Sequence, residues 1–541
     1  FGAPRTDELR KVEKWIKAGG SGNLEDCTFR LSPTTRAAIS HTRYACAYPQ
    51  CPHLRDCVWM DLKRAVAKAD VIVANHHIFL LESEGSQLLP RCDGVVFDEG
   101  QALEDAASAV LGERLSQHFV TSLLRGVLAS QGPLGLASDL SPGEVEMTRN
   151  QIQFVLDETR AFFQAVRGHV WTRYGGSEEV RLQEPLAVQD TLAGPLEDLA
   201  AALQDLAGHT SRQEASVELA GAAKALLDVQ AGLSTIITVS QPDHVYWLES
   251  EQRADADVAL NSAPVEPGQA LAERIFEQYA PAVVTSATLR VGGSFEFVRS
   301  RIGAHEAGEL SVSSPFDYSS RCKLYLPPSM PDPGRQAHDY EARLLPLIGE
   351  LLEVSRGRAF VLFTSYRQME AAATWLEDEG FDDKYGLLVQ GDLPRHELLE
   401  RFRGTPGSVL LGTRTFWQGV DVPGEALVAV IIAKLPFQVP DEPLVQARCQ
   451  AIERRGGNPF MEYSVPTAAM ALRQAFGRLI RTREDYGLVA VLDPRLRTKR
   501  YGEFFLESLP DCPVTSDMDE LREAFAFWEN LPAGATGQGA G

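Results

Sequence analysis

Two adjacent carboxylates, Asp98 and Glu99, have the residue types and the position for catalysis. They end the apolar run 94–97, and Gly100, Gln101 and a helix-like segment follow them. A buried parallel strand can hold two acids only at its carboxyl end, where the sheet opens onto a ligand crevice. Phosphoryl transfer uses this arrangement, with one carboxylate for Mg²⁺ and its neighbour to orient or deprotonate the attacking water. The pair also fits a helix N-cap followed by a favourable first-turn acid, so two interpretations stay open.

Three cysteines, Cys46, Cys51 and Cys57, lie close together in a loop that contains prolines. Neighbouring thiols in a reducing compartment bind metal more often than they pair with each other. Zinc sites usually show C-x2-C spacing, whereas wider, irregular spacing suits an iron–sulfur cluster. We therefore expect a cluster here, with zinc or free thiols as the alternatives. A fourth thiolate is needed; Cys27 is the nearby candidate, and Cys92 lies beside the acidic strand.

The composition is that of an ordinary globular chain, with 44% hydrophobic and 23% charged residues. No apolar run reaches the roughly 18 residues of a membrane span, so no membrane is expected. Eight scattered cysteines are too few for a disulfide scaffold, which favours a reducing, cytoplasmic setting. The net charge of −22 argues at first against nucleic acid, but phosphate contacts depend on local clusters, such as 473–483 and 495–500.

Short apolar runs separated by helical patterns predict the elements that must position these residues. The run 69–74 predicts a buried strand that ends at Asn75, His76 and His77. Adjacent strand residues point to opposite faces, so joint metal binding by the two histidines is not expected. Later runs predict a second parallel α/β domain. They are Ala282–Leu289, Ala359–Ser365, Leu387–Gln390, Ser408–Thr413, Leu427–Ala433 and Leu488–Asp493.

Between the two sheet-forming regions, residues 106–280 have a helical character. One leucine stripe recurs at intervals of three and four residues and a second at intervals of seven, which predicts two antiparallel helices with a shared core. The first stripe is Leu192, Leu196, Leu199, Leu203 and Leu206, and the second is Leu219, Leu226 and Leu233. The last residues, 531–541, are rich in Gly and Ala, and we expect them to be disordered.

Several stretches, taken in order along almost the whole chain, resemble the DinG/YoaA branch of XPD-like superfamily 2 helicases. Residues 98–101 are similar to the DEAH box, 285–289 to motif III, 412–424 to motif V and 474–481 to motif VI. The C-x4-C-x5-C loop, Asn75–His77, Ser314–Tyr318 and Leu435–Phe437 add to the match. The resemblance implies an ATP-driven 5′-to-3′ DNA helicase with a [4Fe–4S] cluster, two RecA-like parallel-sheet domains, an iron–sulfur loop domain and a helical Arch insertion.

The resemblance also implies roles for individual residues. Asp98 would hold the Mg²⁺ shell and Glu99 would position the hydrolytic water. Arg478 and Arg481, expected on one helix at i and i+3, would reach the γ-phosphate of ATP as arginine fingers. Residues near the nucleotide would be Gly419, Asp421, Gln474 and Gly477, and those coupling the acidic box to the DNA path would be Ser286, Ala287 and Thr288.

The implied domains are 1–105, the remainder of RecA-like domain 1 with its cluster region at 25–66; 106–280, the Arch; 281–304, a return to domain 1; and 305–530, RecA-like domain 2. The implied partners are single-stranded and forked DNA and a replication or repair protein, such as a clamp-loader subunit or single-strand-binding protein. These partners imply a nucleoid-associated location.

The sequence departs from the family pattern in three ways. Gln101 stands where the family usually has His, which affects coupling more than hydrolysis. The printed chain contains no G-x-x-x-x-G-K-[ST] loop, and the family places this loop and its first cluster cysteine upstream of Phe1. We therefore expect a family member without its N-terminal part, inactive alone, in which Cys27 is a substitute ligand. The competing hypothesis is an ATP-inactive nucleic-acid-binding or scaffold protein descended from a helicase.

Overall fold

The computed structural model describes residues 5–32, 35–36, 39–40, 51, 54–83, 89–129, 132–175, 178–250, 257–413, 416, 422 and 424–530. The chain divides into two compact units. The first unit comprises Phe1–Val95 and Leu103–Pro281, and the second comprises Val96–Ala102 and Ala282–Gly541. None of the described helices combines the length and the apolar character that crossing a membrane requires.

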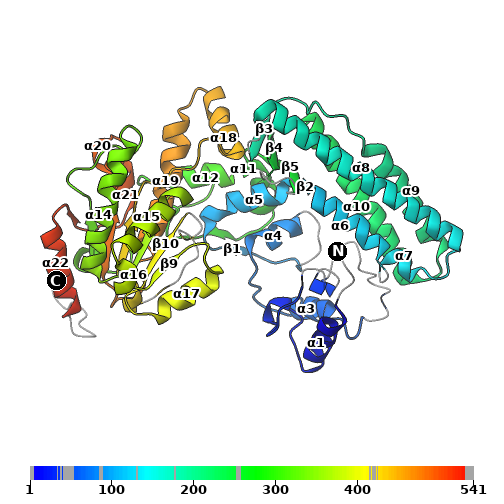
Figure 1. Ribbon diagram of the computed structural model, residues 1–541, viewed down its shortest axis with the longest axis horizontal. Coiled ribbons are helices and arrows are strands. Elements are labelled where there is room, and N and C mark those ends of the chain that lie inside the picture. The colour runs from blue at the N-terminus through cyan, green and yellow to red at the C-terminus, as the bar shows by residue number, and fades with distance from the viewer. Residues whose placement is uncertain are drawn as a thin grey trace. The chain divides into compact units, whose positions relative to one another are not determined.

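The second unit is built on a seven-stranded sheet in which all neighbouring strands are parallel (Figure 1). Its order is β13-β7-β12-β11-β8-β10-β9. The strands are β7 (Cys322–Tyr325), β8 (Ala359–Leu362), β9 (Leu387–Val389), β10 (Val409–Gly412), β11 (Ala429–Ile432), β12 (Gly487–Val491) and β13 (Val514–Thr515). The predicted parallel α/β domain is therefore present, and each predicted run from 359 to 493 contains one strand.

Both faces of this sheet are buried, which explains why its strands are continuous apolar runs. Along β8, Phe360 and Leu362 belong to one hydrophobic cluster, while Ala359 and Val361 belong to another. Successive strand residues point to opposite faces, so each run supplies both cores. Helices α14, α15 and α22 pack on one face, and α17, α19, α20 and α21 pack on the other.

The helices of the second unit include those that join its parallel strands, because each crossover in a parallel sheet needs a connection about as long as a helix. They are α12 (Glu296–Ile302), α13 (Tyr318–Arg321), α14 (Ala337–Ser355), α15 (Tyr366–Asp378), α16 (Phe381–Lys384), α17 (Arg395–Gly404), α18 (Pro443–Arg454), α19 (Val465–Phe476), α20 (Arg495–Thr498), α21 (Gly502–Ser508) and α22 (Met518–Glu529). Short helical turns lie at η2 (Gly100–Ala102), η5 (Gly424–Ala426) and η6 (Phe460–Ser464).

A separate pair of strands, β1 (Val95–Phe97) and β6 (Ala282–Val284), brings distant parts of the chain together. The Val95 N–H donates to the Pro281 carbonyl at 3.0 Å, and the Thr285 N–H donates to the Phe97 carbonyl at 2.8 Å. Both strands advance together through these bonds, so they are parallel and end at the same edge. The acidic residues after β1 and the hydroxyl residues after β6 therefore start from neighbouring positions.

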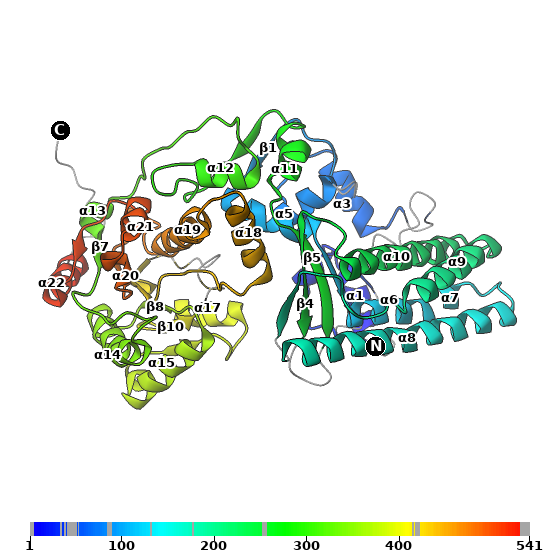
Figure 2. The same ribbon diagram turned by 90° about the horizontal axis from the view of Figure 1, so that it is seen from above.

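The first unit contains the predicted helical region. Its helices are α1 (Thr6–Lys17), α3 (Val58–Val66), α4 (His76–Ser83), α5 (Leu103–Leu111), α6 (Gln117–Leu128), α7 (Pro133–Leu136), α8 (Pro142–Tyr174), α9 (Ala193–His209), α10 (Gln213–Thr238) and α11 (Gly268–Leu271), with short turns at η1 (Leu24–Asp26) and η3 (Ala272–Phe276). Figure 2 shows α8, α9 and α10 side by side. Three residues join α9 to α10, and the leucines of both predicted stripes are buried in their shared core, so this prediction is confirmed.

The sequence analysis missed a sheet in this region. Four antiparallel strands, in the order β2-β5-β4-β3, pack against the helices. They are β2 (Glu113–Ser116), β3 (Glu179–Leu182), β4 (His244–Ser250) and β5 (Val258–Pro264). The central strand β5 is buried at every position although it contains Asn261 and Ser262, so it lacks the polar alternation by which a half-buried strand is recognised.

One predicted strand was wrong. Residues 69–75 form no strand, and the side chains of Val71 and Val73 are 81% and 95% exposed. Helix α4 begins at His76, and the Asn75 Oδ1 accepts the Ile78 N–H at 2.8 Å, as an N-capping side chain does. Asn75–His77 is therefore a helix start and not the end of a buried strand.

Candidate active site

The two carboxylates lie in a tight turn directly after β1. Phe97, the last residue of β1, is buried in the core, whereas Asp98 and Glu99 are exposed. Glu99 has a φ of +51°, a backbone conformation that side-chain-bearing residues seldom adopt. At Gly100 a Cβ would lie 2.1 Å from the Cγ1 of Val284, so only glycine allows this close approach to β6. The turn is therefore fixed from both sides, by strand pairing and by close packing.

Hydrogen bonds connect the acidic turn to the predicted coupling residues. The Asp98 Oδ1 accepts the Glu99 N–H at 2.9 Å. The Glu99 Oε2 accepts from the Gln101 Nε2 at 2.7 Å and from the Ser286 hydroxyl at 3.4 Å. The Ser286 Oγ also accepts the N–H of the buried Thr288 at 3.1 Å. The orientation of the Glu99 carboxylate is thus set by hydrogen bonds from its own turn and from the segment after β6.

Arg478 lies within the electrostatic field of Glu99, and both residues belong to the second unit. Burial lowers the pKa of the Arg478 guanidinium, the negative charge of Glu99 opposes that shift, and the charge of Arg395 adds to it. A half-buried cation in the field of a carboxylate at a strand end can stabilise negative charge on a phosphoryl group.

The predicted helix through Arg478 and Arg481 was wrong. Helix α19 ends at Phe476, and Arg478 lies in the turn that follows. The Asp485 carboxylate explains this ending, because its Oδ2 accepts the N–H groups of Arg481 and Thr482, both at 2.8 Å. These bonds hold the chain in a loop that leads into β12. The Arg481 Nε donates to the Arg478 carbonyl at 3.3 Å, so loop geometry brings the two arginines together.

Arg481 has surroundings of its own. Burial lowers the pKa of its guanidinium, the negative charge of Asp485 opposes that shift, and the charge of Arg403 adds to it. Gln474 is buried on α19, and the N–H of Gly477 ends the helix by donating to the Arg473 carbonyl at 2.9 Å. Gln474, Gly477, Arg478 and Arg481 therefore lie at the end of α19 or in the turn and loop that follow it.

Sequence reasoning missed two arginines at this site, Arg395 and Arg403. Both lie on α17, and their charges act on Arg478 and Arg481. The Arg395 guanidinium lies 5.5 Å from the ring centroid of Phe416, in the stretch similar to motif V. Their position on a helix directly after β9 was the available signal, because helices at the carboxyl ends of parallel strands border the ligand crevice.

Two predicted residues, Gly419 and Asp421, lie outside the described residues. Nearby, the Gln390 Oε1 accepts from the Thr413 N–H at 2.7 Å and lies 3.1 Å from the Thr413 hydroxyl. These bonds fix the start of the segment that leads to both residues.

The predicted cluster ligands are only partly described. Cys46 lies outside the described residues, whereas Cys27, Cys51 and Cys57 are half-buried thiols in the first unit. Among the residues that the structure describes, no three His, Cys, Asp or Glu side chains are grouped so that they could hold a metal ion. Half-buried thiols have the donor chemistry that iron requires, but the ligand set of the cluster stays a prediction.

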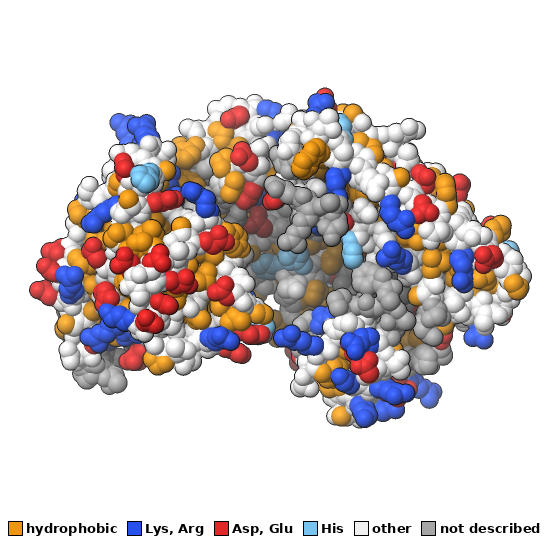
Figure 3. Space-filling view, in the orientation of Figure 1, with side chains coloured by type: hydrophobic (Ala, Val, Ile, Leu, Met, Phe, Trp, Pro, Cys, Tyr) orange, Lys and Arg blue, Asp and Glu red, His pale blue; other side chains and the backbone are white. Residues whose placement is uncertain are grey.

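The two late basic clusters are partly used inside the protein. Arg495 donates two hydrogen bonds to the buried Asp493, one from Nε to Oδ1 at 2.9 Å and one from Nη2 to Oδ2 at 2.6 Å. Arg473 donates to the Arg290 carbonyl at 3.0 Å. Over the face of the second unit drawn in Figure 3, acidic and basic side chains are interspersed. These arginines are therefore structural, and the phosphate contacts predicted for the clusters remain untested.

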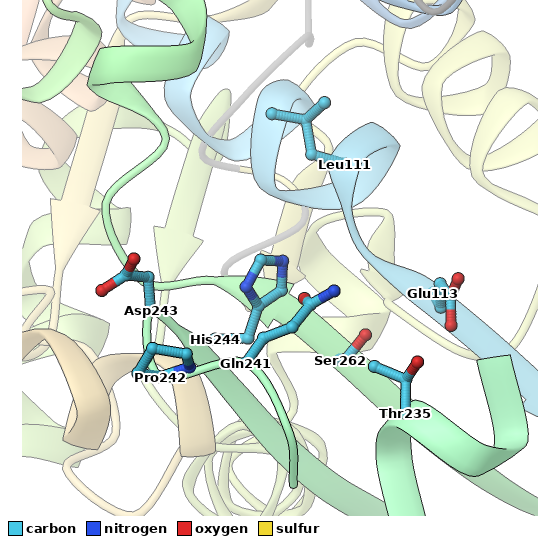
Figure 4. A pocket seen from close by; sticks show the side chains of 8 residues that line it. All are labelled: Leu111, Glu113, Thr235, Gln241, Pro242, Asp243, His244 and Ser262. Carbon is cyan, nitrogen blue, oxygen red and sulfur yellow. The ribbon is translucent and has the colours of Figure 1, made fainter. Parts of the chain in front are cut away.

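A cavity of about 340 Å³ in the first unit is lined by none of the predicted site residues (Figure 4). Burial lowers the pKa of its His244 and raises the pKa of its Glu113, to which the charge of Asp228 adds. The lining residues are Leu111, Glu113, Thr235, Gln241, Pro242, Asp243, His244 and Ser262. The cavity therefore offers polar groups but no part of the arrangement around Glu99.

Comparisons with known proteins show which proteins this chain is similar to. Residues 348–512 match the family model of the helicase C-terminal domain. The ATP-dependent DNA helicase YoaA of Escherichia coli K12 is 32% identical over 518 residues, which cover 94% of this chain and 77% of that protein. YoaA of Haemophilus influenzae is 29% identical over 532 residues, covering 95% and 78%. A solved XPD helicase structure superposes with a TM-score of 0.55 at 15% identity, covering 86% of this chain and 76% of that one. That likeness shows an XPD-like fold with RecA-like parallel sheets.

Proposed function

The chain belongs to the YoaA/DinG family of ATP-dependent DNA helicases, and from this premise we propose that it couples ATP hydrolysis to 5′-to-3′ movement along single-stranded DNA. Movement in one direction along one strand would separate forked DNA during repair or replication. A clamp-loader subunit or a single-strand-binding protein is the proposed recruiting partner, which would place the protein at the nucleoid.

One observation carries the catalytic part of this proposal: the Glu99 carboxylate, held by Gln101 and Ser286, lies in the field of the half-buried Arg478. Attack of water on a phosphoryl group needs a carboxylate to orient or deprotonate the water and a cation to stabilise the charge that develops. Glu99 and Arg478 offer these two groups. Arg481, linked to the Arg478 carbonyl, is proposed to act beside it.

Asp98 fits the role of the metal-binding carboxylate. It is exposed at the end of β1, and carboxylate oxygens are the ligands that Mg²⁺ prefers. Mg²⁺ bound there would neutralise phosphate charge. By donating its N–H to Asp98 Oδ1, Glu99 keeps the metal ligand and the proposed base at a constant separation.

The Thr288 N–H donates to the Ser286 hydroxyl, which in turn donates to Glu99, and these two bonds form the proposed coupling path. A change in the charge at Glu99 during hydrolysis would alter the acceptor that orients the Ser286 hydroxyl. Ala287 lies between the two hydroxyl residues and carries the backbone of this segment. Gly419, Asp421, Gln474 and Gly477 are proposed to border the nucleotide.

A [4Fe–4S] cluster held by Cys46, Cys51 and Cys57, with Cys27 as fourth ligand, is proposed for the first unit. The cluster would crosslink a segment that is rich in loops. Thiol side chains at Cys51 and Cys57 lie on either side of a short turn, in which the Leu54 N–H donates to the Cys51 carbonyl at 3.3 Å.

The first unit offers a local basic surface for DNA in spite of the chain's net charge. Lys and Arg side chains gather over α1 and α3 in Figure 3. The exposed members on α1 are Arg10, Lys11, Lys14 and Lys17. Each phosphate that such groups neutralise releases a counterion, so DNA affinity should fall steeply with salt. Replacing Lys11 and Lys14 by Glu should weaken binding and reduce that salt dependence.

ATP hydrolysis with and without single-stranded DNA tests the proposal, using protein expressed from the complete coding sequence. We expect hydrolysis to depend on DNA, and Glu99→Gln to abolish turnover while ATP binding persists, because the amide keeps the size of the side chain but cannot act as a base. Glu146→Gln, an exposed site on α8, is the matched control. DNA binding without hydrolysis in the unaltered protein would instead favour the ATP-inactive scaffold.

The 541-residue chain should be measured alongside. It contains no G-x-x-x-x-G-K-[ST] stretch to cradle the phosphates, so we expect weak nucleotide binding and no turnover. DNA-stimulated hydrolysis by this chain alone would show that a different segment supplies the phosphate site.

A further inference from the structure

Two cysteines of the second unit lie opposite each other on adjacent strands. Cys322 is the first residue of β7, and Cys512 precedes β13 by two residues. The register of these strands pairs Leu324 with Val514, and the same offset places Cys322 opposite Cys512. The bond from the Leu324 N–H to the Pro513 carbonyl, at 2.9 Å, continues the pairing toward the cysteines.

The two side chains also share one environment. Cys322 belongs to the hydrophobic cluster on one side of the sheet, Cys512 packs against the same cluster, and the Cys512 thiol acts electrostatically on Cys322. Neighbouring strands are about 4.8 Å apart. Disulfides form between residues whose Cα atoms are about 4.4–6.8 Å apart, so this pair can be bridged without moving the backbone far.

We propose that Cys322 and Cys512 form a reversible disulfide that fastens the C-terminal strand and helix to the sheet when the protein meets a hydroperoxide. This site is independent of the proposed ATP chemistry and of the predicted cluster cysteines, which lie in the first unit.

The exposures of the two thiols assign their roles in the reaction. Cys322 is fully buried, and burial together with its Cys512 neighbour raises the pKa of its thiol well above the ordinary range. Cys512 is half-buried, so it is the thiol that a hydroperoxide can reach. Its thiolate attacks the terminal peroxide oxygen, which forms a sulfenic acid and releases hydroxide or, after proton uptake, water. The Cys322 sulfur then attacks the sulfenic sulfur, the S–S bond forms, and hydroxide leaves and takes up the thiol proton as water. Two thiols and one H₂O₂ thus give one disulfide and two waters.

The disulfide would act at the edge of the sheet, where the shortest strand is attached. Strand β13 is a two-residue edge strand, attached to β7 by bonds such as the 2.9 Å contact from the Leu326 N–H to the Thr515 carbonyl. Beyond it, α22 is attached through its buried apolar face and through a 2.6 Å ion pair between Lys323 and Glu520. A covalent link at 322–512 would keep this strand and helix in place when those contacts open.

Site-resolved alkylation of the full chain tests the proposal. The protein is treated with hydrogen peroxide, remaining thiols are alkylated, and every cysteine-containing peptide is quantified by mass spectrometry. We expect the Cys322 and Cys512 peptides to lose alkylation together and to appear as one crosslinked species, lighter than their sum by two hydrogen atoms. Dithiothreitol should restore both. The oxidised protein should also retain α22 for longer during proteolysis.

Two variants separate this pair from the other cysteines. Cys512→Ser should leave Cys322 alkylatable after peroxide and denaturation, and should remove the proteolytic protection. Cys449→Ser, a half-buried cysteine on α18, is the matched control and should leave the crosslink unchanged. Sulfinic acid at Cys512 with Cys322 still alkylatable, or crosslinks from either thiol to other cysteines, would overturn the proposal. These outcomes are read in the unaltered protein, so they do not depend on the folding of a variant.

Discussion

Gln101 donates a hydrogen bond from its Nε2 to the Oε2 of Glu99 at 2.7 Å, across a turn of three residues. The Oε1 of the same amide is buried without a hydrogen-bond partner among the described residues. Turning the amide over would place an oxygen against the carboxylate, which is repulsive. The donor is therefore directed at Glu99, and Gln101 is a positioning residue for the proposed base.

Replacing Gln101 by Ala should lower DNA-stimulated ATP turnover by about 10-fold or more, because a hydrogen bond to a charged group contributes about 1.5–3 kcal/mol. Gln101→His, which keeps a donor, should retain more activity. Gln153→Ala on α8, where the amide bonds to Asp157, is the control. The rate is measured at saturating ATP and DNA. Unchanged turnover in Gln101→Ala would remove the positioning role.

Replacing Arg478 by Ala should lower the turnover rate by about 10³-fold or more, the range for loss of an arginine that stabilises phosphoryl transfer. Arg478→Lys should not restore it, because a point charge cannot replace the planar guanidinium fork. DNA affinity, measured by fluorescence anisotropy, should change little. Arg454→Ala, an exposed arginine on α18 outside both basic clusters, serves as the control. A parallel loss of DNA binding would make Arg478 a phosphate contact with DNA.

Purified protein should contain iron and acid-labile sulfide, and show the visible charge-transfer absorbance of a thiolate-bound cluster. Cys51→Ser should remove the colour and abolish unwinding, whereas Cys449→Ser should do neither. Cys27→Ser decides whether Cys27 is the fourth ligand. Stoichiometric zinc without iron, after anaerobic purification, would mean that the loop binds zinc.

Asp139 should stabilise the first unit in a pH-dependent way. Its carboxylate accepts from the Thr210 hydroxyl at 2.7 Å and from the Ser211 N–H and hydroxyl at 2.6 and 2.7 Å. These bonds, that to Thr210 first, hold the pKa of Asp139 well below its usual range. Because the pKa is lower in the folded state, the stabilisation is complete above the unfolded pKa of about 4 and is lost as the pH falls below it.

Thermal unfolding of Asp139→Asn as a function of pH checks this expectation. The variant should melt below the unaltered protein at pH 7, and the difference should narrow under acid conditions below about pH 4. Asp157→Asn, which removes an exposed ion pair with Arg160 on α8, should show a small difference at pH 7. A difference for Asp139→Asn that stays constant with pH would mean that its hydrogen bonds do not depend on the charge.

Strands of the second unit could be predicted because burial on both faces makes them apolar throughout, as in Leu427–Ala433 around β11. The short edge strand β13 could not, because two residues carry no periodicity. The run with Val71 and Val73 gave the opposite error, a predicted strand that the structure does not contain. These residues are exposed, and an apolar stretch forms a strand only where a neighbouring strand can pair with it.

At the candidate site, residue types could be predicted but not the backbone that presents them. The acids at 98–99 were recognisable because two carboxylates end an apolar run. The loop after Phe476 was not recognisable, because it depends on one side chain. The Asp485 carboxylate accepts hydrogen bonds from the backbone N–H groups of Arg481 and Thr482, and these bonds compete with continuation of the helix. Arg395 was missed since its link to Arg478 is set by the sheet order.

That sheet order also has a consequence for how the protein is made. Strand β7 emerges first from the ribosome among the seven, yet its neighbours are β12 and β13, which emerge last. Throughout most of the translation of this unit, both edges of an apolar strand lack their partners, and such edges invite pairing with other chains. The nascent second unit can therefore complete its sheet only after β12 and β13 have also left the ribosome, so its folding must wait for the last two of its seven strands.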